Sequence, residues 1–272
     1  MRLYTRALLA AVAVAAVACG DNTPTSSLAP SDAPARITNG TPTGTSYGSV
    51  GNLFVDEDND GDWDWRCSGT LISATVFLTA GHCYEEGATY YVTFAPVALP
   101  VSEPLSANTS LISSTTAYLH PDYQFPYNDM AVVILPAGST TGIAPTPLAP
   151  EGYLVDVKSE GAWGQKTATV VGYGTASFGQ GPYYTQNDAV RRYADLKVIS
   201  FNAYYLQLKN NAVKAGMTGA CYGDSGGPVL IDGYLVGVTS WVLPAGCHGI
   251  SGYSRVDTES AIDFLSEFVA ID

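Results

Sequence analysis

The chain has 272 residues, of which 46% are hydrophobic and 14% charged, and its net charge of -13 corresponds to a pI near 4.4. This length allows a buried core in one large β domain or in two small ones. The acidic balance repels phosphates and no basic, aromatic-interleaved stripe offsets it, so nucleic acid is excluded as a partner. Abundant glycine and tyrosine favour short strands joined by turns, so an all-β fold is expected.

The N-terminal segment 1–18 has the features of an export signal. Arg2 and Arg6 give it a basic start, and residues 8–18 are uninterrupted apolar or small residues. A short core helix is the alternative, but the basic flank favours export. No later stretch approaches the length of about 20 apolar residues that a membrane helix needs. We therefore expect a secreted protein.

The next segment, 19–36, is polar and rich in proline, serine and alanine, so we expect a disordered tether or propeptide. The folded part begins at Ile37. From there to about residue 150, short strand-like runs alternate with turn residues, which predicts one β-barrel. The runs are NLFV, CSGTLIS, VFLTA, TYYVTFA and MAVVIL.

A second series of such runs follows the proline-rich stretch TGIAPTPLAPEG and predicts another barrel over about 151–257. Only the last segment, about 258–270, carries a helical pattern, which Asp257 or Thr258 could cap. The runs of the second series are ATVVGYG, DLKVIS, YYLQLK, PVLIDGYLVGVTSW and GYSRV.

Ser225 lies in the motif GDSGGP, where flanking glycines allow a tight turn whose N–H groups can bind an oxyanion. A serine hydroxyl is a poor nucleophile alone, so the chemistry needs an imidazole base and a carboxylate that orients it. Among three histidines, His82 in LTAGHC adjoins a cysteine that can pin its loop. His120 precedes a proline and His248 follows a cysteine, so His82 is the candidate base.

Asp129 stands at the start of the apolar run NDMAVVIL, where burial would demand a partner. Each motif alone also fits a bland interpretation: a Gly-rich turn, a satisfied loop histidine, or an acid that begins a strand. Together and in this order, LTAGHC, NDMAVVIL and GDSGGP resemble the motifs of the chymotrypsin-like serine peptidase family, over residues 37–272. The resemblance implies two six-stranded antiparallel β-barrels with the active site in the cleft between them, and a C-terminal helix.

The family's catalytic roles can be carried over to these residues. The resemblance implies that His82 exchanges the proton of Ser225, that Asp129 orients the imidazole, and that the N–H groups of Gly223 and Ser225 form the oxyanion hole. It implies a serine endopeptidase of polypeptide substrates that requires no cofactor. The alternative is a peptidase-like binding or scaffold protein that has lost the activity.

The substrate-binding residues also follow from the resemblance. Gly219, six positions before Ser225, would form the base of the specificity pocket, and it offers no acid for a Lys or Arg side chain. A β-branched wall at Val242 favours small or medium apolar residues, although loop differences could reshape the pocket. The full set is Gly219, Tyr222, Ser240, Trp241, Val242 and Ser251.

Five cysteines in an exported protein leave one unpaired. The resemblance implies disulfides that join Cys67 to Cys83 and Cys221 to Cys247. A further disulfide of the family has no cysteines here, so the loop before Met217 is expected to be looser or reshaped.

The segment RITNG at 36–40 resembles the family's zymogen cleavage site. A cut after Arg36 would free the Ile37 amine to pair with Asp224 and order the oxyanion hole, so an activating protease is an expected partner. Cys19 follows small residues, as in a bacterial lipoprotein signal, which suggests a lipid anchor at the cell envelope until that cut. Ordinary cleavage after residue 18 is the alternative, and a monomer is expected.

An acidic run precedes the first disulfide cysteine. The spacing of its aspartates resembles the front of a calcium loop, but the position for the bidentate glutamate is Cys67, so the run is not an EF-hand. Crowded carboxylates repel one another without a cation, which favours a structural Ca²⁺, and a solvated hairpin turn is the alternative. The candidate ligands are Asp56, Asp58, Asp60 and Asp62, followed by Asp64.

Overall fold

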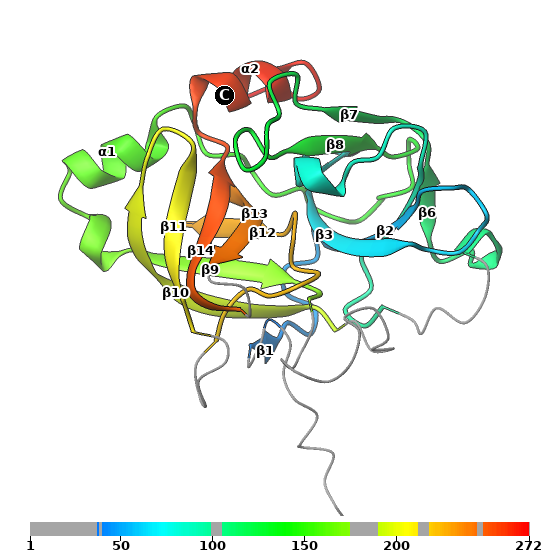
Figure 1. The fold of residues 1–272 in the computed structure, drawn as a ribbon, viewed down its shortest axis with the longest axis horizontal. Coiled ribbons are helices and arrows are strands. Elements are labelled where there is room, and N and C mark those ends of the chain that lie inside the picture. Colours follow the sequence, from blue (N-terminus) through cyan, green and yellow to red (C-terminus); the bar gives the residue numbers. More distant parts are fainter. Residues whose placement is uncertain are drawn as a thin grey trace, which may run out of the picture. The chain divides into compact units, whose positions relative to one another are not determined.

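The structure is a computed structural model that describes residues 37, 40–98, 105–174, 190–211, 218–243 and 247–271 (Figure 1). The chain divides after Ala33, and every described residue lies in the part that follows. The expected signal, the tether, Cys19 and Arg36 lie outside the described residues. Within those ranges, no helix has the length and apolar character needed to cross a bilayer.

The first β-barrel is an antiparallel sheet in the order β6-β5-β2-β3-β4-β8-β7. All five predicted strand runs fall on it. Seven strands stand where six were expected, because the stretch 112–119 is split into β6 and β7, which pair with opposite edges. The strands are β2 Val50–Asp56, β3 Trp65–Leu71, β4 Val76–Thr79, β5 Thr89–Thr93, β6 Ile112–Ser114, β7 Ala117–Leu119 and β8 Ala131–Ile134.

The second barrel closes through six antiparallel strands, since β9 pairs with both β10 and β12. The short strand β1 extends this sheet by pairing Thr41 with Tyr193 of β10. The N-terminal part of the predicted first barrel therefore belongs to the second. The strands are β1 Thr41–Pro42, β9 Thr167–Gly172, β10 Arg192–Phe201, β11 Tyr205–Asn211, β12 Pro228–Ile231, β13 Tyr234–Leu243 and β14 His248–Arg255.

The expected C-terminal helix is α2, Glu259–Ser266, and the hydroxyl of Thr258 caps it by accepting the Ala261 N–H at 3.3 Å. A second helix, α1 at Tyr153–Ser159, contradicts the expectation that only the C-terminal segment is helical. This helix is short and buries few apolar side chains, so its sequence carries little helical period. Within the described ranges, 3₁₀ turns span Gly81–Cys83, Leu105–Ala107 and Trp163–Gln165.

The two barrels pack together through a shared core. Apolar side chains of the first barrel contact Leu235 and Val238 of β13 as well as Phe264 of α2. The second barrel has its own core, which includes the fully buried Ile37. The expected fold of two antiparallel barrels with a C-terminal helix is confirmed.

Candidate active site

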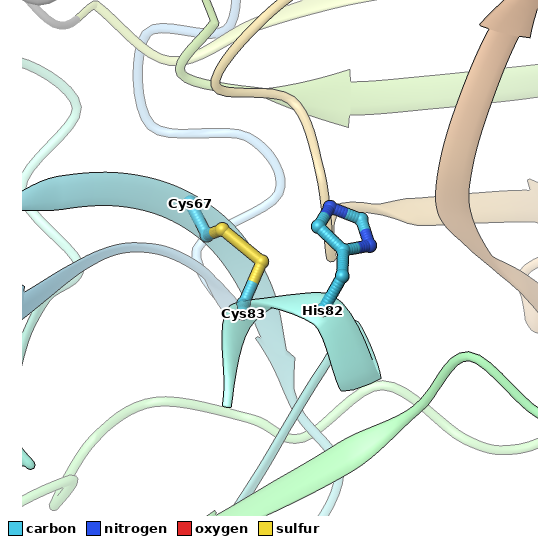
Figure 2. A group of neighbouring side chains, drawn as sticks. All are labelled: Cys67, His82 and Cys83. Atoms are coloured by element: carbon cyan, nitrogen blue, oxygen red, sulfur yellow. A yellow bond between two sulfur atoms is a disulfide. The ribbon is translucent and has the colours of Figure 1, made fainter. Parts of the chain in front are cut away.

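His82 lies in the 3₁₀ turn Gly81–Cys83 that follows β4. The next residue, Cys83, forms a disulfide with Cys67 of β3, so a covalent bond fixes the turn to the first barrel. Figure 2 shows the disulfide and the imidazole leaving the same turn. The His82 side chain is 27% exposed and is therefore open to a ligand.

Asp129, two residues before β8, holds the imidazole. One carboxylate oxygen accepts the backbone N–H of His82 at 2.8 Å, and the other lies 2.8 Å from its Nδ1. The hydroxyl of Ser240 donates to that second oxygen. Asp129 is fully buried, so these bonds supply the partners that a buried carboxylate requires. The arrangement fixes which nitrogen of the ring faces the acid.

Ser225 lies in a turn that only glycines permit. A Cβ on Gly226 would stand 2.2 Å from the Thr79 hydroxyl, and Gly223 has a φ of +90°. Ser68 of β3 clamps the turn, because its N–H donates to the Ser225 carbonyl at 2.7 Å and its hydroxyl to that of Gly223 at 2.9 Å. Among the described residues, no acceptor takes the N–H of Gly223 or Ser225, so both are free to bind an anionic oxygen.

Two adjoining cavities meet at His82 and Ser225. These side chains make no hydrogen bond to each other in the described part of the chain, which is common before a substrate binds. The larger cavity, about 620 Å³, is also lined by Trp65, Arg66, Cys67, Tyr84, Glu85, Tyr222 and Gly223. The smaller, about 300 Å³, is also lined by Phe125, Cys221, Tyr222, Thr239, Ser240, Trp241, Val242 and Cys247.

The predicted substrate-binding residues divide into two groups. Tyr222, Ser240, Trp241 and Val242 border the cavities, whereas Gly219 and Ser251 do not. Ser251 is fully buried, and its hydroxyl pairs with that of Tyr253 at 2.8 Å. The cavities are also lined by residues that no sequence pattern indicated, because they lie outside the three motifs: Trp65, Arg66, Tyr84, Glu85, Phe125 and Thr239.

Asp224 is also buried, beside the nucleophile candidate. Its carboxylate accepts the N–H of Gly174 at 2.8 Å and that of Cys221 at 2.9 Å. Cys221 forms the second implied disulfide, with Cys247. Burial lowers the pKa of the Arg66 guanidinium, and the negative charge of Asp224 partly opposes this shift. The acid thus lies within the electrostatic reach of the cleft.

The acidic run brings together a different set of carboxylates from the one predicted. Oxygens of Asp56, Asp58 and Asp64 lie within 4.8 Å of one another, whereas Asp60 and Asp62 are not in that group. Asp56 is buried and accepts the N–H groups of Asp60 and Gly61, both at 3.1 Å, so hydrogen bonds already shape the turn. A calcium ion here stays a prediction.

One further cluster pairs His82 with Cys67 and Cys83. Both sulfur atoms belong to the disulfide and are not thiolates, which are the form in which cysteine ligates metals. This cluster therefore lacks the chemistry of a metal site.

A family model described as Trypsin matches residues 46–262, which is most of the chain. The chain belongs to the trypsin family of serine peptidases. It is accordingly a serine-type endopeptidase, and its substrates are polypeptides.

Several relatives support this assignment. A trypsin from Saccharopolyspora erythraea is 30% identical over 203 residues, which cover 70% of this chain and 82% of the relative. A trypsin from Phaedon cochleariae is 30% identical over 185 residues, which cover 64% and 68%. A chymotrypsin from the same organism is 30% identical over 190 residues, covering 66% and 64%.

Solved structures agree on the fold. The structure of HL collagenase is similar with a TM-score of 0.64 and 23% identity, over 85% of this chain and 97% of that one. Human heparin binding protein is similar with a TM-score of 0.61 and 18% identity, over 86% and 99%. At these identities, the likeness concerns the fold alone.

Proposed function

We propose that this endopeptidase cleaves peptide bonds through an acyl-enzyme on Ser225, with His82 as the base and Asp129 as the residue that orients it. The observation that carries the proposal is the His82 Nδ1 to Asp129 contact of 2.8 Å beside a cleft that Ser225 shares with His82. With Nδ1 held by the acid, Nε2 is the nitrogen left for proton transfer.

The reaction then proceeds in two halves. Ser225 Oγ attacks the scissile carbonyl carbon while His82 takes its proton, and the N–H groups of Gly223 and Ser225 stabilise the oxyanion. His82 returns the proton to the departing amine, which leaves an ester on Ser225. A water molecule, deprotonated by His82, hydrolyses that ester and regenerates the serine.

The test is covalent labelling with a fluorophosphonate, which reacts with an activated serine. The activated protein should be labelled at Ser225, and Ser225→Ala should abolish both labelling and peptidase activity. Ser110→Ala, which removes an exposed serine far from the cleft residues in sequence, is the control and should be labelled normally. Labelling elsewhere, or activity that survives Ser225→Ala, would refute the assignment.

The substrate preference belongs to the same proposal. Val242 and Cys221 border the smaller cavity, and Gly219 supplies no charge, so small or medium apolar residues should precede the scissile bond. Peptides with Ala, Val or Leu at that position should be cleaved faster than Lys or Arg peptides. A tenfold advantage for Lys or Arg would overturn the preference.

Activation by a cut after Arg36 completes the proposal. Support comes from Ile37, which is fully buried in the core of the second barrel, and from Asp224, which lies buried next to Ser225. The new ammonium of Ile37 would leave water and pair with the Asp224 carboxylate, which would order the oxyanion hole. Arg36→Gln should leave the precursor inactive, whereas full activity without a cut would exclude this switch.

We also place the precursor outside the cytoplasm, anchored through Cys19 until the cut releases it. The support is the basic, apolar start of the sequence and the fact that the other four cysteines pair with one another in the two described disulfides. With Arg36→Gln the full chain should stay with the membrane fraction, and with Cys19→Ser it should become soluble. A soluble Arg36→Gln precursor would contradict the anchor.

A further inference from the structure

Gly219, the residue expected at the base of the specificity pocket, lies unexpectedly close to the side chain of Asn210. A Cβ built on Gly219 would stand 1.8 Å from Oδ1 and 2.6 Å from Cγ of Asn210. Contacts that short do not occur between real atoms, so any side chain at position 219 would occupy the same space as the Asn210 side chain. The carboxamide of Asn210 therefore fills the volume that a side chain at position 219 would otherwise take.

Asn210 reaches this place from β11. Because side chains alternate along a strand, Leu206, Leu208 and Asn210 share one face. The two leucines are buried in the core of the second barrel, while Lys209 on the other face is exposed. Asn210 is fully buried as well, so this buried face of β11 carries two leucines followed by one polar residue.

A hydrogen bond fixes the carboxamide. Its Nδ2 donates to the Ala220 carbonyl at 3.0 Å, and a carbonyl only accepts, so the nitrogen must face Ala220. The oxygen then points toward Gly219, and among the described residues no group donates to it. The Asn210 side chain is therefore held by Ala220 and lies against the adjacent Gly219.

The smaller cavity stops short of this pair. It reaches Cys221 and Val242, whereas the buried Gly219 and Asn210 are not among its lining residues. Cys221, which lines the cavity, follows Ala220, whose carbonyl accepts the Asn210 Nδ2, so the carboxamide lies directly behind the segment that forms this end of the cavity. Without Asn210, the absence of a side chain at Gly219 would let the cavity extend inward.

We propose that Asn210 is a specificity-determining residue, whose carboxamide closes the inner end of the pocket in place of a side chain at position 219. The closure is uncharged, so the pocket gives no counter-charge to Lys or Arg, and it limits the length of the side chain admitted. This inference rests on the proposed role of Ser225 and deepens it by naming the residue that restricts the substrate to short, uncharged side chains.

Cleavage of a peptide panel tests the restriction. Asn210→Ala should raise kcat/KM for Phe and Met peptides relative to Ala peptides by about tenfold, because the inner end opens. Lys209→Ala, on the exposed face of the same strand, is the matched control and should keep the original profile. An unchanged profile in a folded Asn210→Ala enzyme would overturn the inference.

A double-mutant cycle tests the contact without using activity. Gly219→Ala should lower the melting temperature in the native background, because its Cβ collides with the carboxamide. In the Asn210→Ala background the same change should cost little. Equal losses in both backgrounds would mean that the two residues do not compete for space.

The double variant Asn210→Ala with Gly219→Asn returns a carboxamide to the pocket from the other side. It should restore the preference for short side chains that Asn210→Ala loses, and a profile still open to Phe would contradict the inference. Fluorophosphonate labelling of each variant separates the two proposals. Absence of labelling in the unaltered enzyme counts against Ser225, whereas normal labelling with an unmoved profile counts against Asn210 alone.

Discussion

At the scale of single residues, Asp129 organises the candidate site through several hydrogen bonds. It is fully buried, and it bonds both the backbone and the ring of His82 while the Ser240 hydroxyl donates to it as well. These bonds need an acceptor that takes N–H and O–H donors on two oxygens. A carboxylate provides this, and a carboxamide offers only one acceptor atom.

Asp129→Asn should therefore disable catalysis while keeping the fold. An amide nitrogen facing Nδ1 favours the wrong tautomer of His82, and kcat should fall by about 10⁴-fold at neutral pH. Steady-state kinetics with an active-site titration measures this. Asp122→Asn, an exposed acid in the same loop, is the control. A loss below tenfold would show that Asp129 does not orient the base.

At the scale of elements, the buried pair of Arg255 and Asp257 ties three segments together. Arg255, at the end of β14, donates from Nε and an Nη atom to the two carboxylate oxygens of Asp257, at 2.8 and 2.9 Å. Asp257 also accepts the Leu154 N–H in α1, and α2 begins two residues later. The carboxylate therefore binds α1 through its backbone and lies just before the start of α2.

Asp257→Ala should reduce the free energy of unfolding by about 3–5 kcal/mol, because it strands a buried guanidinium. Urea unfolding of the inactive Ser225→Ala protein measures this without self-digestion. Asp263→Ala, an exposed acid in α2, should change stability little. If the two variants have the same free energy of unfolding, the pair of Arg255 and Asp257 does not stabilise the fold.

The acidic turn between β2 and β3 yields another prediction at this scale. If Ca²⁺ binds Asp56, Asp58 and Asp64, millimolar calcium should raise the melting temperature of stripped protein. Asp58→Asn should remove that increase, whereas Asp62→Asn, outside the converging group, should retain it. An unchanged melting temperature in the unaltered protein would leave the solvated turn as the explanation.

At the scale of the whole molecule, the junction between the barrels contains a buried polar network. Tyr173, just after β9, donates to the Ala95 carbonyl at 2.8 Å, across to the first barrel. The fully buried Arg191 donates to the carbonyls of Val50 and Phe94, at 2.9 and 3.0 Å. Because the buried carbonyls would be left without a hydrogen-bond donor if these bonds broke, the bonds fix how the two barrels pack together.

This junction predicts a loss of stability at alkaline pH. Burial raises the pKa of Tyr173 to about 12, and it raises that of Tyr90 to about 12 as well. In the unfolded chain tyrosine ionises near 10, so stability is retained below about pH 10 and falls between about 10 and 12. Thermal melts from pH 8 to 11 measure this. Tyr173→Phe should flatten the decline, and a slope identical to that of the unaltered protein would refute it.

The sequence predicted most of this architecture because the central strands carry long apolar runs between turns. The strands β2, β4 and β8 are nearly all buried, so their pattern is strong. The elements that were missed are short: β1 has two residues, β6 and β7 three each, and α1 buries only Leu154 and Val157. Too few buried positions leave no period to detect.

The site divides in the same way. The three candidate catalytic residues could be predicted because each lies in a motif with characteristic neighbours: His82, Asp129 and Ser225. The structure brings His82 and Asp129 into contact. The importance of Asn210 depends on a partner nine residues away that approaches through space, and its own neighbours are ordinary strand residues. A contact made by folding alone leaves no trace in the local sequence.

The edge strand β1 has a kinetic consequence. Thr41 is fixed to the second barrel through Tyr193, and Ile37 is only four residues away, a span of at most about 14 Å. A terminus released at Ile37 would thus be confined near its binding site, at an effective concentration of the order of millimolar or higher. In the proposed activation, its insertion would be a unimolecular step, so the delay between the cut after Arg36 and the onset of activity should not depend on the protein concentration.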